Sequence, residues 1–429
     1  MTSFANVSPN PDPPDAAAAR AFSLASPPAG FIDNPYPWYA ALRQHDPVHE
    51  LGPNSLLLTR CADLMAVYRH PDARSDKKRE FAPKFGIGSP LFEHHTTSLV
   101  FSDPPLHTRV RRLLTGALNQ RAVARIESGL IGLVDRLIDR LATLPHPDLI
   151  ADFAARIPVE VIGSLLDVPH DEREPLQGWS IDILSALEPV PGSELLDRGH
   201  RAVSDFLDYL RGLVARRRRA PGDPEVDVLT RLIQGETDGE RLSESELLHN
   251  CIFLLNAGHE TTTNLIGNGL EALMRHRDQL ERLVREPALI ASAVEEVLRF
   301  ESPLQLNNRL AGSDIVLPAD PLTGRGEFTL AAGTFITLGV GAANRDPEVF
   351  SDPQRLDIAR RPNPQLAFGH GAHACAGMSI ARLEARVAIG RLLARYPGLE
   401  PAAPADRDRR IRFRGFRKIP VALNPRSVR

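Results

Sequence analysis

The feature that most constrains the fold is a long stretch without proline, residues 243–275, that follows a helical pattern. Ser243 with Glu246 three residues later is the signature of a capping box, so we expect the helix to begin there. A helix of this length would measure about 45–50 Å, enough to cross the whole molecule. Because residues 252–255 are all apolar, we expect the centre of this helix to be buried.

The remaining patterns predict a mainly helical protein with a minor β part. Apolar residues recur at helical spacing over most of the region from about 107 to 233. Further helices are expected at 278–286, 290–300 and 378–393, and short strands at 55–60, at 309–340 and near the C-terminus. The pattern therefore favours helices packed around the long one, with strands to one side.

The chain divides into an N-terminal arm and one large unit. Residues 1–33 are rich in proline and alanine, which predicts a flexible arm. No clear linker interrupts residues 34–429, so a single interlocked domain is expected there. Prolines and glycines make residues 72–105 irregular and break the helical pattern at 183–200, and we expect both segments to form lids.

Composition excludes several classes of protein. A hydrophobic content of 42% and a charged content of 24% are typical of a soluble globular protein, and a net charge of −3 gives no general attraction to nucleic acid. The run of arginines at 216–219 is better explained as cations at the end of a helix. Three widely spaced cysteines, Cys61, Cys251 and Cys375, argue against a disulfide framework and favour a reducing, cytoplasmic compartment. No apolar run reaches the ~18 residues of a membrane-spanning helix.

The centre of the long helix contains residues that disfavour helix formation. Gly258 and the threonines at 261–263 are poor helix formers, and Glu260 introduces a carboxyl group into an otherwise apolar region. Local conflicts of this kind tend to mark functional sites. The alternative is an ordinary helix crossing with Gly258 as the contact point, and these residues leave both interpretations open.

A second candidate is the pair Glu296 and Arg299. The two residues are three apart on one predicted helix, which is close enough for an ion pair. On spacing alone an ordinary surface pair of little energetic value is the better explanation.

The third candidate is the loop AFGHGAHACAG, residues 367–377. A structural zinc site needs about four ligands, whereas His370, His373 and Cys375 offer at most three. A cysteine nucleophile would need a base and an oxyanion site, and neither is visible. Cys375 lies just before a predicted helix, whose N-terminus lowers the pKa of a thiol, and Gly371 and Gly377 let backbone approach a large flat group. This combination suits an axial thiolate ligand to haem iron.

These three motifs together resemble the cytochrome P450 family, and in particular its soluble bacterial members, over about residues 34–423. The pattern F-x-x-G-x-H-x-C-x-G is matched by Phe368, Gly371, His373, Cys375 and Gly377. The pattern E-x-x-R is matched by Glu296 and Arg299, and A-G-x-[DE]-T-T by Ala257, Gly258, Glu260, Thr261 and Thr262. The first pattern is highly specific, and the other two support it.

The resemblance implies a role for each matching residue. Cys375 would be the proximal thiolate ligand of haem b, with Phe368 packed near its sulfur. The remaining implied cofactor contacts are His107, Arg111, Arg309 and His373 at the haem propionates, with Ala257, Gly258 and Gly377 around the ring. Glu296 and Arg299 would form a buried network with Arg355 that braces the cysteine loop. Thr261 and Glu260 would deliver protons on the opposite, distal side.

The implied fold is a mainly helical, prism-like domain with the long helix over the haem. The implied activity is that of a monooxygenase, which activates O₂ with two electrons and inserts one oxygen atom into a mainly apolar small molecule by hydroxylation, epoxidation or O-dealkylation. Coupling or desaturation at the same site, and a haem sensor without turnover, are the alternatives. Glu260 and Thr261 argue against the sensor.

The electrons are expected from a separate ferredoxin or flavodoxin with its NAD(P)H reductase. Three cysteines cannot ligate an iron–sulfur cluster while one of them ligates haem. The family places a basic stretch on the proximal face, here Arg109, Arg112, Arg121 and Arg125, where an acidic partner would bind. The alternative is a solvated helix face. We expect a monomer that binds neither nucleic acid nor membrane.

The substrate pocket is expected along Phe253, Asn256, Leu304 and Gln305. Two of these are polar where apolar side chains are common, which suggests an apolar substrate with at least one heteroatom. The alternative is that Asn256 bonds to helix backbone or water. Two features depart from the family pattern, namely the long excursion at 317–327 and the small residues Ala374 and Ala376 beside the cysteine.

Overall fold

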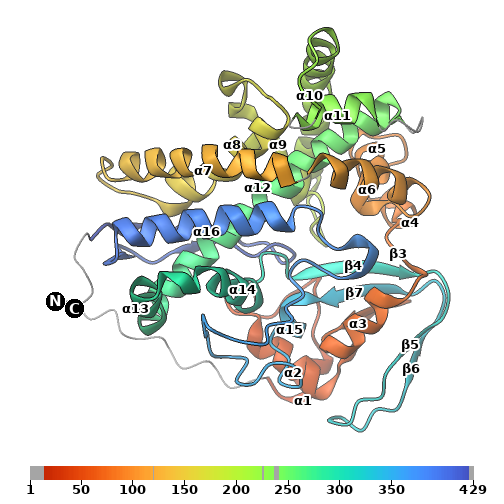
Figure 1. Cartoon of the computed structure of the whole chain (residues 1–429). Helices are drawn as coiled ribbons and strands as arrows, with labels where there is room; N and C mark the ends of the chain where they lie inside the picture. The colour runs from red at the N-terminus through yellow and green to blue at the C-terminus, as the bar shows by residue number, and fades with distance from the viewer. Residues whose placement is uncertain (1–13, 119, 225–226, 236–240, 425–429) are drawn as a thin grey trace.

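The computed structural model describes residues 14–118, 120–224, 227–235 and 241–424. Its axis is helix α12 (Glu244–Arg275), which Figure 1 shows running through the helical part of the molecule. The Ser243 hydroxyl accepts from the N–H of Glu246, and the Glu246 carboxylate accepts from the N–H of Ser243, so the predicted capping box is confirmed. Most of the helix is buried, as its apolar centre predicts.

Helices from both halves of the chain pack against α12. Those in contact with it are α5 (Pro90–Thr97), α8 (Arg156–Leu165), α9 (Glu174–Ser185), α10 (Ser193–Arg219), α11 (Val228–Gln234), α13 (Arg277–Arg285), α14 (Ile290–Phe300) and α16 (Met378–Arg395). Helix α7 (Gln120–Leu141) lies along α16, and α6 (Leu106–Ala117) lies beside α11. Together these helices enclose one large apolar core.

The predicted β part is a small sheet beside the helical core (Figure 1). Its strand order is β1 (Val48–Gly52), β2 (Ser55–Leu58), β7 (Phe335–Gly339), β4 (Leu306–Ala311) and β3 (Ala73–Arg74). Strands β2 and β7 run parallel, whereas the other neighbours are antiparallel. Two short pairs near the C-terminus join β8 (Glu400–Pro401) to β11 (Val421–Ala422) and β9 (Asp406–Arg407) to β10 (Phe416–Lys418).

Short helices surround the sheet and connect the longer elements. They are α2 (Tyr36–His45), α3 (Cys61–Arg69) and α15 (Val340–Ala343), with single turns at Leu99–Phe101, His170–Glu172, Pro287–Leu289 and Gly371–His373 and a π-helical turn at Leu149–Ala154. The expectation of a mainly helical fold with a minor β part is therefore confirmed. No helix in the described ranges combines the length and apolarity needed to cross a membrane.

The unexplained excursion at 317–327 is the end of a β-hairpin. Strands β5 (Ile315–Leu317) and β6 (Phe328–Leu330) pair in antiparallel register, and their connection projects from the sheet in Figure 1. Arg325 reaches back to donate to both carboxylate oxygens of the buried Asp63 at 3.0 and 3.2 Å. The hairpin is thus fastened to α3 by a partly buried ion pair.

The prediction of a flexible arm over residues 1–33 is wrong where the structure describes it. Residues Ala16–Arg20 form helix α1, and Phe22, Leu24 and Phe31 are buried in an aromatic cluster with α2. The prediction rested on the high proline and alanine content and overlooked these three large apolar side chains. Each side chain stabilises the fold by removing apolar surface from water when the segment packs on the sheet. Residues 1–13 of that prediction lie outside the described residues.

The two predicted irregular segments are also more helical than expected. Residues 72–105 contain α4 (Lys78–Phe85) as well as α5, which Ser89 caps and Pro90 opens. In the other segment, only residues 186–192 separate α9 from α10. Pro90 stands at the start of α5, where a proline is tolerated, and Pro83 lies within α4, whereas Pro189 and Pro191 lie in the connection between α9 and α10. Helix α10 ends at Arg219, so the arginine run does close a helix as predicted.

Candidate active site

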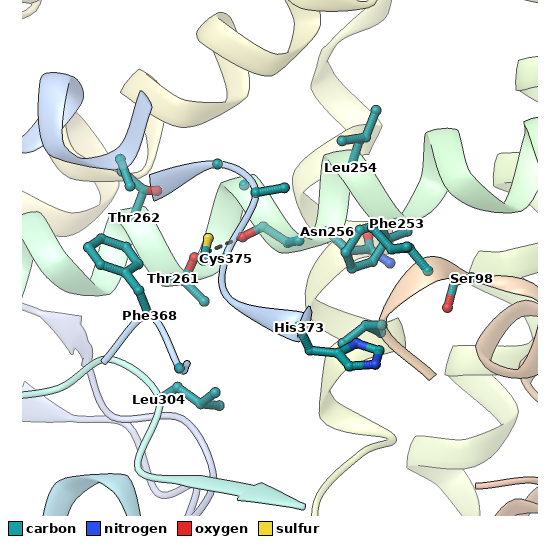
Figure 2. A pocket seen from close by; sticks show the side chains of 18 of the residues that line it. Ser98, Phe253, Leu254, Asn256, Thr261, Thr262, Leu304, Phe368, His373 and Cys375 are labelled. Carbon is teal, nitrogen blue, oxygen red and sulfur yellow. Dashed lines mark hydrogen bonds between the residues drawn. The ribbon is translucent and has the colours of Figure 1, made fainter. Parts of the chain in front are cut away.

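A cavity of about 310 Å³ lies between the centre of α12 and the loop that holds Cys375. Ala257 and Thr261 of α12 line it, and so do Phe368 and Cys375 of the loop; Figure 2 shows the side chains of Thr261, Phe368 and Cys375. Most of the other lining side chains are apolar. They come mainly from residues 98–118, from α12 and from residues 367–384, with a few from α8, α9 and the connection between α14 and β4. The cavity thus brings together residues that are more than a hundred positions apart in the sequence.

The cysteine loop has a fixed backbone. The N–H of Cys375 donates to the carbonyl of Phe368 at 2.9 Å, and Gly369 and Gly371 have positive φ angles of 66° and 74°. A Cβ atom on Gly371 would lie 2.5 Å from the carbonyl oxygen of Tyr68, so only glycine fits there. The loop ends at Gly377, which is the N-cap of α16.

Cys375 presents one sulfur to the cavity at the start of α16. Burial raises the pKa of its thiol, while the N–H of Gly377 and the charges of Arg111 and Arg382 lower it. No cluster of three or more His, Cys, Asp or Glu side chains that could hold a metal occurs in the described part of the chain. Because His370 is exposed and His373 turns toward α6, the loop offers a single sulfur ligand rather than a zinc site.

Four basic or imidazole groups gather beside the loop. His107, Arg111 and His373 line the cavity, and the rings of His107 and His373 lie 3.9 Å apart. Arg309 of β4 is buried close by, since its charge lowers the pKa of both histidines. His107 Nε2 is buried without a hydrogen-bond partner, and within the described residues neither arginine has a carboxylate within ion-pair distance. The cluster therefore suits an anionic group that enters the cavity.

Glu296 and Arg299 form a fully buried pair, not a surface one. Both side chains are 0% exposed, and the guanidinium donates twice to the carboxylate, at 2.7 and 2.8 Å. Arg299 also donates to the carbonyls of Asn344, Pro353 and Arg355. These hydrogen bonds use the N–H donors of the Arg299 guanidinium and connect α14 to the segment that leads into the cysteine loop.

The prediction of Arg355 as the third charged member is wrong. Its side chain is exposed and only its carbonyl takes part, whereas Arg360 donates to both oxygens of Glu296 at 3.1 Å. Both arginines belong to the segment DPQRLDIAR. Sequence spacing could not separate them, because the turn at residues 352–355 decides which side chain faces α14.

Thr261 lines the cavity, and its side chain adds a hydrogen bond to the backbone of α12. Its hydroxyl donates to the carbonyl of Ala257 at 2.8 Å, one turn earlier. Gly258 serves as a helix contact, because a Cβ atom there would lie 2.4 Å from the Ile162 side chain of α8. The two interpretations of this region are therefore compatible, since one side of the turn packs against α8 and the adjacent side faces the cavity.

Glu260 does not line the cavity. Its buried carboxylate pairs with Arg410, which also pairs with Asp408. Burial raises the pKa of Glu260, and the nearby charge of Arg410 lowers it. Sequence reasoning missed Arg410, which lies 150 positions away in an irregular segment and has no motif around it.

Three of the four predicted pocket residues line the cavity. They are Phe253, Asn256 and Leu304 (Figure 2). Asn256 is 2% exposed, and neither its amide nitrogen nor its amide oxygen has a hydrogen-bond partner within the part of the chain that the structure describes. The helix-backbone part of the alternative is therefore not met among the described residues, and the amide lines the cavity, where a ligand would reach it.

The prediction that Gln305 lies on the pocket wall is wrong. Leu304 and Leu306 line the cavity, and Gln305 between them points to the opposite side, as the alternation of an extended strand requires. Its amide donates to the carbonyl of Ser302 at 2.7 Å and packs against Gly341.

The predicted basic stretch is only partly available on the surface. Arg109 is engaged by Glu246 and the carbonyl of Arg241, so its charge is paired at the start of α12. Arg112, Arg121 and Arg125 are exposed. Arg112 also lines a shallow hollow with Ala372 of the cysteine loop, which places part of this stretch next to the sulfur-bearing segment.

Comparison with known proteins agrees with this geometry. The family model described as cytochrome P450 matches residues 177–410. The chain is 39% identical over 406 residues to the vitamin D(3) 25-hydroxylase of Pseudonocardia autotrophica, covering 93% of this chain and 96% of that protein. The chain belongs to the cytochrome P450 family.

Other relatives support the assignment to this P450 family. The biotin biosynthesis cytochrome P450 of Bacillus subtilis is 34% identical over 400 residues, covering 92% of this chain and 97% of that protein. The crystal structure of P450BioI in complex with hexadec-9Z-enoic acid ligated acyl carrier protein has a TM-score of 0.83 at 33% identity, covering 92% of this chain and 99% of that one. The protein is therefore a haem-thiolate monooxygenase that works with a redox partner and a small-molecule substrate.

The buried network gives a direct prediction for stability. Glu296→Leu leaves the guanidinium of Arg299 buried without its carboxylate, which is expected to lower the free energy of unfolding by about 3–5 kcal/mol. The matched control is Glu295→Gln on the same helix, because Glu295 and Arg382 form a pair that is 28% and 32% exposed. This control is expected to cost about 1 kcal/mol or less. Chemical denaturation of both variants measures the difference, and equal costs would contradict the account.

Proposed function

We propose that this cytochrome P450 oxygenates a mainly apolar small molecule in the cavity between α12 and the cysteine loop, and that Cys375 is its haem ligand. The observation that carries the proposal is the single sulfur of Cys375, which lines the same mainly apolar cavity as Thr261 of α12. A lone thiolate at a helix N-terminus is the arrangement that a haem-thiolate site requires.

The residues of the cavity fit haem. Cys375 would provide the axial thiolate, Phe368 would pack beside it, and Ala257 and Gly377 would border the ring. His107, Arg111, Arg309 and His373 would bind the two propionates, which matches an unpartnered His107 nitrogen and two arginines without carboxylate partners. When bound, the haem iron supplies the activation of O₂.

Thr261 and Glu260 would divide the proton transfer between them. The Thr261 hydroxyl lies at the cavity wall, whereas Glu260 lies on the neighbouring side of α12 with its carboxylate held by Arg410. Glu260 would therefore act through water and not by direct contact, and Arg410 would keep it oriented. In this arrangement the Thr261 hydroxyl would hold a proton at the cavity wall. The Glu260 carboxylate would supply the next proton to it through water.

The partner that delivers the electrons would be a ferredoxin or flavodoxin with an NAD(P)H reductase. Arg112, Arg121 and Arg125 are exposed, and Arg112 lies next to the cysteine loop, so this basic surface would attract an acidic protein. A cytoplasmic location fits the three cysteines, none of which forms a disulfide.

Thr261→Ala is expected to uncouple electron use from product formation. Without the hydroxyl, proton delivery is misdirected, so the yield of product per NAD(P)H consumed should fall about tenfold or more. The assay uses a compound selected by its shift of the ferric Soret band and compares product, NAD(P)H and hydrogen peroxide. Thr263→Ala is the matched control, because Thr263 makes the same kind of bond, to the carbonyl of His259, but does not line the cavity. Unchanged coupling in Thr261→Ala would remove Thr261 from the mechanism.

Reduction by an acidic ferredoxin is expected to slow as salt rises. The electrostatic part of the association rate is screened when the Debye length falls from about 30 Å at 0.01 M salt to about 3 Å at 1 M. Stopped-flow reduction measures the second-order rate constant, and Arg125→Glu should lower it at low salt. Arg201→Glu, at an exposed position of α10, is the control. A rate that is independent of salt would contradict the docking surface.

A further inference from the structure

A second arginine, besides Arg111, lines the cavity. Arg412 lies beside Phe413 in the C-terminal segment, and both side chains line the cavity. Its Nη1 donates to the Asn308 side chain at 2.6 Å, while its Nε is buried with no hydrogen-bond partner among the described residues. Among the described residues, no carboxylate lies within ion-pair distance of this guanidinium.

Glu188 is the acidic residue whose charge acts most strongly on Arg412. One of its carboxylate oxygens accepts from the backbone N–H groups of Ile411 and Arg412, at 3.0 and 3.4 Å, and among the described residues the other oxygen is buried without a hydrogen-bond partner. These bonds fix the loop that carries Arg412 but leave the guanidinium without a carboxylate. Because a buried guanidinium without an anion is costly, the site gains stability when an anionic group enters the cavity.

The surroundings of Arg412 are rich in donors and cations. His95 lines the same cavity, is 2% exposed, and its Nε2 is buried without a partner. Lys77 and Lys84 lie close by, since their charges and that of Arg412 help to lower the pKa of His95 to about 3, after burial. Lys84 donates to the carbonyl of Glu188, and Lys77 lies 3.9 Å from Glu80. This group therefore contains three basic side chains, those of Arg412 and the two lysines, and two carboxylates, those of Glu80 and Glu188. The imidazole of His95 is neutral near pH 7.

This group is distinct from the cluster proposed to bind the propionates. The charges that act on His107 and His373 are mainly those of Arg111 and Arg309. The charge of Arg412 acts on His95 and the two lysines, and Arg309 also acts on Lys77, so the two groups adjoin. The charge of Arg412 is not among those that act on His107 or His373, so Arg412 extends the electropositive lining beyond the cluster that would bind the propionates.

We infer that the substrate carries a carboxylate, which Arg412 binds with a hydrogen bond from His95 while the apolar body of the molecule lies over α12. The inference rests on the proposed monooxygenase function and narrows its substrate class to amphipathic carboxylic acids. Asn256, with its unpartnered amide, provides a second, uncharged contact along the same cavity. Charge-assisted hydrogen bonds to a buried carboxylate are strong, so this contact would determine specificity.

The test compares acids with their methyl esters on the haem-loaded protein. Dodecanoic acid, abietic acid and deoxycholic acid provide three body shapes, and each is paired with its ester. Titration of the ferric Soret band and calorimetry both give the affinity. At least one acid should bind about tenfold or more tightly than its ester, and Arg412→Gln should weaken that acid about 10- to 100-fold while leaving the ester within about twofold.

Three variants serve as controls. Arg412→Lys keeps the charge but loses the fork, so it should retain part of the preference for the acid. Arg409→Gln removes an arginine that is 59% exposed on the same segment and should change nothing. Asn256→Leu removes a neutral contact and should weaken acid and ester alike.

Several outcomes would overturn the inference. The first is that no acid binds more tightly than its ester, and the second is that the preference for the acid persists in Arg412→Gln. The third is that Arg412→Gln loses haem while Arg412→Lys retains it, which would make Arg412 a cofactor contact. Turnover of the esters without any preference for the acids would overturn the carboxylate site and leave the monooxygenase function intact. Absence of turnover with every compound, together with loss of the thiolate-type spectrum, would instead contradict the proposed function.

Discussion

The buried pair of Glu296 and Arg299 is the interaction on which the site depends. The cysteine loop contains only one short helical turn, Gly371–His373, so its position depends on side-chain and backbone hydrogen bonds to neighbouring segments. Arg299 donates to the carbonyl of Asn344, and the Asn344 side chain accepts from the N–H of Leu366, at the start of the loop. Burying the charges of Glu296 and Arg299 is costly by itself. The hydrogen bonds that this pair makes nevertheless position the cysteine loop, and with it the sulfur, relative to α14 and α12.

Helix α12 combines two requirements that favour different residues. As the central rod it needs apolar side chains and close contacts, which its capping box, its buried flanks and Gly258 provide. As a cavity wall it needs polar groups, which Asn256 and Thr261 supply at some cost in helix propensity. The surrounding helices stabilise the rod enough to accommodate this polar turn.

The sequence predicted the elements with strong periodicity and the residues with local motifs. The bounds of α12 and α14, the pairing of Glu296 with Arg299, and the glycine requirement at Gly371 all follow from spacing, capping or φ preference. Contacts between distant segments could not be predicted in this way. Arg410 beside Glu260 and Arg412 at the cavity come from one irregular segment near the C-terminus, where no period or motif indicates which side chains point inward.

The central claim, that Cys375 is the ligand of the haem iron, is tested most directly by the spectrum of the reduced protein with carbon monoxide. The wild-type protein is expected to show the red-shifted Soret band of a thiolate-ligated complex, because a thiolate donates more electron density than a neutral ligand. Cys375→Ser should abolish that band, whereas Cys251→Ser, at a buried cysteine outside the cavity, should retain it. The same band in Cys375→Ser would contradict the account.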